Sequence, residues 1–117
     1  MKPAIDNFLP LAPATLHILL SLAGEKMYGY AIMQEVARQS EGQYKLGPGT
    51  LYDNLQKLMT HGLVEPAHRP RPDDDPRRRY YRLTGAGRGV LTAEIARLEG
   101  VVREARIHLR ALPRRAS

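Results

Sequence analysis

The segment 46–65, LGPGTLYDNLQKLMTHGLVE, brings several hydrogen-bonding side chains onto one predicted helix. Leu51, Leu55 and Leu58 recur at i, i+4 and i+7, so they define a buried face. The GPG start leaves the backbone open to close approach, and the free N–H groups of a helix start favour an anion such as a phosphate. Amide side chains can pair with adenine, and an ammonium group with guanine or phosphate. The residues expected to contact nucleic acid here are Gly49, Thr50, Tyr52, Asn54, Gln56 and Lys57.

A second group of charged side chains lies between residues 69 and 79, where five arginines accompany three consecutive aspartates at 73–75. The arginines attract phosphates, whereas the acidic tip repels them. We therefore expect Arg77, Arg78 and Arg79 to contact a nucleic-acid backbone while the acidic tip stays outside the groove. The alternative is an ordinary solvated hairpin.

The elements that must position these residues follow from the spacing of apolar side chains. Segment 14–24 is apolar nearly all round and predicts a central helix, and segment 25–42 predicts a second helix. The third helix ends at Gly62. Two short extended runs, 63–69 and 78–83, flank PRPDDDP and predict a β-hairpin.

Finer expectations concern single strands and side chains. The run QYKL at 43–46 could pair briefly as a strand. In the second hairpin strand, Tyr81 and Leu83 are expected to face inward, and Tyr80 and Arg82 outward, because side chains alternate along a strand. His17 is interpreted as a partly buried or interface histidine rather than a ligand.

Thr84 is a predicted N-cap for a last helix that runs to about residue 112, before Pro113. Its apolar residues advance by alternating steps of four and three, which is typical of a coiled-coil seam. A helix of this length spans roughly 40 Å, so most of it needs a partner, and a second copy of the chain is the simplest one. The alternative is a helix folded back over its own domain. The predicted dimerisation residues are Leu91, Ile95, Leu98, Val102, Ala105, Leu109 and Leu112.

Composition narrows the class of protein. A chain of 117 residues suits one modest domain, and its formal charge of +6 and pI near 10.0 favour a polyanionic partner, nucleic acid before membrane. The lack of cysteine excludes disulfides, zinc–thiolate sites and a cysteine nucleophile, and it fits a cytoplasmic protein. No apolar run approaches the roughly 20 residues of a membrane span, and the N-terminus lacks the apolar block of a signal peptide.

Catalytic and metal-binding patterns are missing from the sequence. The four histidines show no i, i+4 metal spacing, and neither G-x-S-x-G nor a Walker loop occurs. The GAGRG run at 85–89 lacks the βαβ context of a dinucleotide site, so close helix packing is its expected use. We therefore expect no enzyme, no metal and no cofactor.

The order helix, helix, helix, hairpin, helix is that of a winged helix-turn-helix, in which the third helix enters the major groove of DNA. The predicted fold class is mainly α (α+β), a winged helix-turn-helix with a two-stranded wing and a long C-terminal dimerisation helix. The expected divisions are an N-terminal arm at 1–12, a DNA-binding domain at 13–83, and a dimerisation helix with a basic tail at 84–117.

Three segments resemble the PadR family of bacterial transcriptional regulators: LHILLSLAGEKMYGYAIMQEV, GPGTLYDNLQKLMTHGLVE and RRYYRLTGAGRGVL. The resemblance covers residues 16–91. It implies a homodimeric repressor of a palindromic operator in double-stranded DNA, with a small-molecule effector or stress relieving repression in some members. Tyr28 stands where histidine is common in the family, and Asp53 stands where proline is frequent. The chain has no Trp, so the stacking platform of drug-sensing relatives is not carried over.

A winged-helix module that binds another protein is the alternative function. Such an interface would expose aromatic side chains or leucines on the third helix. The outward residues Gln56, Lys57 and Thr60 are polar instead, which favours DNA.

Overall fold

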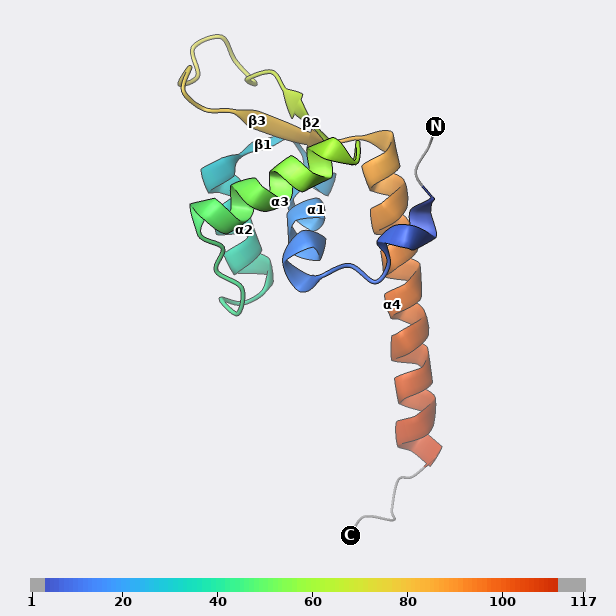
Figure 1. Cartoon of the computed structure of the whole chain (residues 1–117). Coiled ribbons are helices and arrows are strands. Elements are labelled where there is room, and N and C mark those ends of the chain that lie inside the picture. The colour runs from blue at the N-terminus through green and yellow to red at the C-terminus, as the bar shows by residue number, and fades with distance from the viewer. Residues whose placement is uncertain (1–3, 112–117) are drawn as a thin grey trace.

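The computed structural model describes residues 4–111. A short 3₁₀ helix (Ile5–Phe8) precedes three helices and a small sheet, and a long helix follows them (Figure 1). This arrangement confirms the predicted fold class. The elements are α1 (Pro13–Gly24), β1 (Met27–Tyr28), α2 (Gly29–Gln39), α3 (Pro48–Thr60), β2 (Val64–Ala67), β3 (Tyr80–Leu83) and α4 (Gly85–Ala111).

The core lies where α1, α2, α3, the sheet and the first turns of α4 meet. Helix α1 is apolar on most of its circumference, which suits its central place. The predicted inner face of α3 is confirmed, because Leu51, Leu55 and Leu58 are buried. Gly62 ends this part of the chain with a positive φ of 73°, as predicted. The other core side chains are Ile18, Leu19, Leu22, Ile32, Val36, Leu63, Val64, Tyr81, Val90 and Leu91.

The sheet has three antiparallel strands in the order β1-β3-β2, one more than predicted. Met27 pairs with Tyr81 and Tyr28 with Tyr80. The segment 43–46, considered as a strand, has no regular secondary structure. A two-residue strand is too short for any hydrophobic period, so β1 was hidden within a segment interpreted as helix.

The prediction that Tyr80 faces solvent is wrong, since its exposed fraction is 8%. The face of β3 that carries Tyr80 is covered by the ring of Tyr28, whose centroid lies 5.5 Å away. The pairing of β1 with β3 brings that ring into place. Tyr81 is buried on the opposite face and Arg82 is exposed, as predicted.

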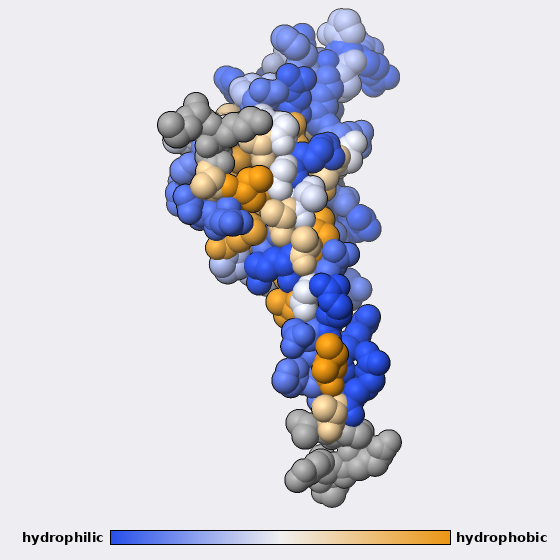
Figure 2. Space-filling view, turned by 90° about the vertical axis from the view of Figure 1, so that its right-hand side faces the viewer, coloured by the Kyte–Doolittle hydropathy of each residue, from blue (hydrophilic) through white to orange (hydrophobic). Residues whose placement is uncertain are grey.

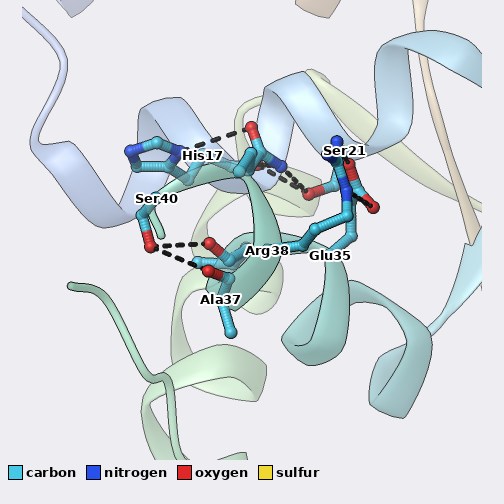
Figure 3. A network of polar contacts seen from close by, with 8 residues as sticks. His17, Ser21, Glu35, Ala37, Arg38 and Ser40 are labelled. Atoms are coloured by element: carbon cyan, nitrogen blue, oxygen red, sulfur yellow. Dashed lines mark hydrogen bonds and ion pairs between the residues drawn. The ribbon is translucent and has the colours of Figure 1, made fainter. Parts of the chain in front are cut away.

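Polar contacts hold α1 against α2 (Figure 3). The Gln39 side-chain amide donates to Ser21 Oγ at 2.7 Å, and Ser21 Oγ donates to the His17 carbonyl at 2.8 Å. His17 Nδ1 lies 3.3 Å from Gln39 Oε1. His17 is thus a half-buried histidine with a structural partner, as interpreted from the sequence.

Helix α4 begins as predicted, because Thr84 Oγ1 accepts the N–H of Gly87 at 3.0 Å. The close packing expected of the GAGRG run is found at Gly87, where an added Cβ would lie 2.1 Å from the Leu63 carbonyl oxygen. The early turns of α4 pack on the domain, and the later turns project beyond it (Figure 1). Within residues 4–111, none of the helices has the length and apolar character needed to cross a membrane.

Glu94 ties the N-terminal arm to α4. Its carboxylate is buried with 1% exposure, and it accepts the backbone N–H of Leu11 at 3.0 Å and two hydrogen bonds from Arg97. The Arg97 guanidinium, followed by the Leu11 N–H, lowers the pKa of the Glu94 carboxyl. A charged Glu94 therefore holds the arm against the base of the long helix.

Candidate nucleic-acid interface

The start of α3 is open, as the GPG sequence predicts. Gly47 is the N-cap residue, Pro48 occupies the first turn, and no side chain among residues 4–111 caps this helix start. Outside the local backbone, none of the described residues has an atom within 4 Å of a Cβ built on Gly47 or Gly49. The first-turn N–H groups and the positive end of the helix dipole thus face a free surface that suits a phosphate.

The outer face of α3 is polar. Thr50, Gln56 and Lys57 are exposed. Lys57 Nζ lies 3.7 Å from Asp53 Oδ2 in an ion pair whose two side chains are about three-quarters exposed. Such an exposed pair is weak and screened, so it leaves Lys57 free to bind a stronger anion.

Asn54 differs from its neighbours on α3 because its side chain is occupied within the protein. Its Oδ1 accepts the Thr15 hydroxyl at 3.1 Å, and its Nδ2 donates to the Thr50 carbonyl at 2.9 Å. Asn54 is also only half exposed. The structure thus makes Asn54 a link between α1 and α3, whereas the sequence suggested readout of a base.

Tyr52 lies at the junction of α2 and α3. Its hydroxyl occupies the position beside Gly29 that a side chain would take, since a Cβ on Gly29 would lie 2.2 Å from that oxygen. Tyr52 keeps an exposed fraction of 46%, and Tyr30, on the next residue of α2, keeps 57%. Gly29 and Tyr30 were not among the predicted contact residues. The signal that could have found them is the YGY sequence at 28–30, which lies within one of the three segments that resemble the family.

The wing consists of β2, β3 and the connecting residues 68–79, and ion pairs neutralise its acidic tip. Asp73 pairs with Arg71 at 3.7 Å, Asp74 with Arg78 at 3.0 Å, and Asp75 with Arg77 at 3.2 Å. Within the wing, the positive charges of these arginines are thus partly neutralised by the negative charges of the aspartates.

Contacts at the base of the wing fix its arginines further. Arg78 lies over the ring of Tyr28 at 4.3 Å from the centroid, a cation–π contact. The Tyr80 hydroxyl, with Arg78, lowers the pKa of the Asp74 carboxyl, and Arg77 lowers that of Asp75. Both carboxyls therefore stay charged at neutral pH and hold their arginines in place.

Arg79 is different from the two arginines before it. In the part of the chain that the structure describes, it forms no ion pair, and its side chain is exposed. It helps to line a groove of about 470 Å³ between the wing and the starts of α2 and α3. The same groove is lined by Tyr28, Gly29, Tyr30, Tyr52, Arg77, Arg78 and Tyr81. The groove thus joins a cation of the wing to aromatic hydroxyls of the helices.

The predicted dimerisation residues fall into two groups. Leu91 is buried in the core with 5% exposure, so it packs within its own chain. Ile95, Val102 and Leu109 are exposed by 40%, 46% and 75%, and Leu98 is partly exposed. Leu112 lies outside the described residues. Ala105 is also exposed, so the predicted seam residues become exposed where α4 leaves the domain.

Metal chemistry finds no support in residues 4–111, where no three His, Asp or Glu side chains come together as a potential metal site. The four histidines do not meet in one place. His17 contacts Gln39, His61 packs edge-on against Phe8, and His108 lies near Glu104.

Comparison with known proteins relates this chain to transcriptional regulators. Residues 18–93 match the family model described as Transcriptional regulator PadR-like family. The transcriptional regulator Rv3488 of Mycobacterium tuberculosis is 39% identical over 93 residues, which are 80% of this chain and 82% of that protein. A PadR family transcription regulator of Clostridium difficile has a similar structure, with a TM-score of 0.70 at 21% identity over 84% of this chain and 99% of that one. RosR of H. salinarum gives a TM-score of 0.61 at 30% identity, over 83% of this chain and 79% of its own.

Proposed function

Because this chain belongs to the PadR-like family of transcriptional regulators, we propose that it represses transcription by binding a palindromic operator as a homodimer. It is a regulator and not an enzyme. In the proposed complex, α3 enters the major groove and the wing lies along the adjacent backbone.

The observation that carries the proposal is the groove shared by α3 and the wing. Tyr52, in the second turn of α3, and Arg79 of the wing line this groove together. A phosphate in the groove would meet tyrosine hydroxyls and the Arg79 guanidinium, which forms no ion pair within residues 4–111. We propose Gly49, Thr50, Tyr52 and Arg79 as backbone contacts, and Gln56 and Lys57 as contacts to base edges or phosphates.

The paired arginines have a different proposed role. Arg77 and Arg78 are engaged by Asp75 and Asp74, so a phosphate would have to compete with those carboxylates. We propose that they shape the wing and add long-range attraction, while Arg79 makes the direct contact. The sequence predicted a backbone contact for all three arginines, whereas this proposal gives the direct contact to Arg79 alone.

Dimerisation through α4 completes the proposed regulator. The helix presents apolar side chains beyond the domain, and a second copy would cover them. Two-fold symmetry of the protein then matches two-fold symmetry of the operator, with half-sites about 34 Å apart or a multiple of that spacing. A small-molecule effector that relieves repression, which the family resemblance implies for some members, is part of the proposal.

Gel-shift titrations against the DNA upstream of the gene for this chain, at two salt concentrations, test DNA binding. We expect tight binding that weakens steeply with salt. Footprinting should then show two protected half-sites. Binding to no fragment even at low salt would favour the alternative, a module that binds another protein. Thermal-shift screening with lipophilic and phenolic compounds tests the effector, because a ligand selective for the folded state raises the melting temperature.

A further inference from the structure

The loop of the wing, residues 68–79, contributes no side chain to the hydrophobic core. Its sequence, HRPRPDDDPRRR, consists of charged residues, prolines and one histidine. Figure 2 shows the end of the molecule that carries the wing as mainly hydrophilic. Since apolar packing cannot order such a loop, polar contacts must fix its shape and the direction of its arginines.

The ion pairs of this loop differ in how far water reaches them. Asp73 and Arg71 have side chains that are 81% and 77% exposed, so their pair is weak. The Asp74 side chain is only 10% exposed, and that of its partner Arg78 is 40% exposed. An aspartate that only kept the loop soluble would stay in water, as Asp73 does. The burial of Asp74 therefore calls for a second role.

Asp74 and Arg78 form a cluster with two tyrosines of the sheet. Asp74 Oδ1 accepts a hydrogen bond from Arg78 Nη1 at 3.0 Å, and the Arg78 guanidinium lies 4.3 Å from the centroid of the Tyr28 ring. Tyr28 and Tyr80 pair across β1 and β3, with ring centroids 5.5 Å apart. The Tyr80 hydroxyl is the main cause of the lowered pKa of the Asp74 carboxyl, so it also faces this carboxylate. The wing clasp is the name used below for Asp74, Arg78, Tyr28 and Tyr80.

The wing clasp joins the tip of the loop to the sheet. Other polar contacts of the loop connect its own residues, such as Asp75 with Arg77 and Arg69 with the Asp74 carbonyl. Asp74 Oδ2 is buried, and no donor within residues 4–111 meets it at hydrogen-bonding distance and angle. The carboxylate thus gives up hydration in order to stay in the clasp, which points to a role in holding the loop in position.

A fixed Arg78 also fixes the backbone of Arg79, because one peptide bond connects the two residues. Arg79 lines the groove beside Tyr52. We propose that Asp74 is a positioning residue for DNA binding, which acts through Arg78 and Tyr28 to hold the wing loop so that Arg79 faces the groove. This inference rests on the proposed function and adds to it a negative charge that DNA binding requires. Charge alone predicts the opposite, because an acidic tip repels phosphates.

Gel shifts of two neighbouring variants on the same operator fragment distinguish positioning from charge. Asp74→Asn and Asp73→Asn each remove one negative charge, so charge alone predicts equal or tighter binding for both. We expect Asp73→Asn to bind at least as tightly as the wild type. Asp74→Asn should bind roughly fivefold more weakly, since Arg79 must then be ordered during binding. Equally tight binding by the two variants would overturn the proposal.

A double-mutant cycle with Arg79→Ala separates positioning from a general loss of structure. If Asp74 acts by directing Arg79, Asp74→Asn should have little further effect on operator affinity once Arg79 is alanine. The two fold-changes would multiply if Asp74 acted independently of Arg79. Such independence would overturn the proposal.

Limited digestion with trypsin reports the state of the loop without DNA. The arginines at 69 and 71 precede prolines, where trypsin does not cut, so its sites in the loop follow the arginines at 77–79. Cleavage at these sites, identified by mass spectrometry, should be several-fold faster in Asp74→Asn than in Asp73→Asn, because an unclasped loop opens more often. Equal rates in the two variants would show that Asp74 does not order the loop and would overturn the proposal.

The wild-type chain separates this proposal from the function on which it rests. A wild type that binds no DNA fragment even at low salt would refute the proposed function, and with it any role of Asp74 in DNA binding. Tight binding by the wild type with no loss in Asp74→Asn would refute the positioning role alone.

Discussion

The Tyr52 hydroxyl fills the space that a side chain on Gly29 would occupy, with 2.2 Å between that oxygen and an added Cβ. This contact joins the first residue of α2 to the first turns of α3. It therefore sets the direction in which Tyr52 enters the groove beside the wing.

Gly29→Ala should disturb DNA binding more than folding. The new methyl group must displace Tyr52, which is 46% exposed and can swing outward, so the free energy of unfolding should fall by about 1 kcal/mol or less. Operator affinity in gel shifts should fall several-fold. Gly24→Ala is the matched control, because a Cβ there meets no atom of the described residues within 4 Å outside the local backbone. Wild-type affinity in the Gly29 variant would exclude a role for the Tyr52 position.

Two glycines of α4 should respond oppositely to alanine. Gly87→Ala should lower the free energy of unfolding by about 1–3 kcal/mol, because the methyl group would collide with the backbone carbonyl of Leu63. Gly89→Ala should be neutral or raise it by up to about 1 kcal/mol, since the nearest atom outside the local backbone among the described residues is Ile5 Cδ1, at an ordinary 3.5 Å. Urea unfolding measures both. Equal effects at the two sites would contradict the close packing of Gly87 against Leu63.

Neighbouring arginines of the wing should differ in their effect on DNA binding. Arg79→Ala should weaken binding and reduce the slope of log affinity against log salt by about one phosphate contact. Arg77→Ala should change the slope less, because Asp75 already engages that guanidinium. Gel shifts over a range of salt concentrations give both slopes. A larger effect of Arg77→Ala would contradict the proposal that Arg79, and not Arg77, makes the direct phosphate contact.

Asn54 and Gln56 should separate stability from recognition. Asn54→Ala removes the contact with Thr15, so it should lower the free energy of unfolding by about 1 kcal/mol. Gln56→Ala removes an exposed side chain, so it should leave unfolding unchanged and lower operator affinity. Chemical denaturation and gel shifts on the two variants form the comparison. A fully stable Asn54 variant with lost affinity would restore the base-contact role predicted from sequence.

Glu94 should make stability depend on acid pH. Its carboxyl has a lowered pKa in the folded state, first because of Arg97, so its contribution is present above the unfolded value of about 4.3 and is lost as pH falls through the folded value. Glu94→Gln should lower stability at pH 7 and flatten its decline between pH 5 and 3. Glu104→Gln, at an exposed site, is the control. Parallel pH profiles for wild type and Glu94→Gln would show that Glu94 does not titrate this way.

Much of the fold was accessible from local patterns. The buried face of α3, the positive φ of Gly62 and the Thr84 cap were predicted because each depends on residues within a few positions of one another. The two-residue strand β1 and the burial of Tyr80 were missed. Both depend on a pairing between segments about fifty residues apart, which leaves no periodic trace in the chain.

The sequence by itself determined the order of the helices and the hairpin, the open GPG start of α3 and an apolar stripe on α4, since helix period and backbone freedom are encoded locally. Only the tertiary structure decided which polar side chains are available to a ligand. The Thr15 hydroxyl forms a hydrogen bond with Asn54, and carboxylates form ion pairs with Arg77 and Arg78. Arg79 has no ion pair among the described residues. The reason is physical: a hydrogen bond or ion pair within the fold competes with any outside partner, and such pairing requires three-dimensional proximity that composition does not specify.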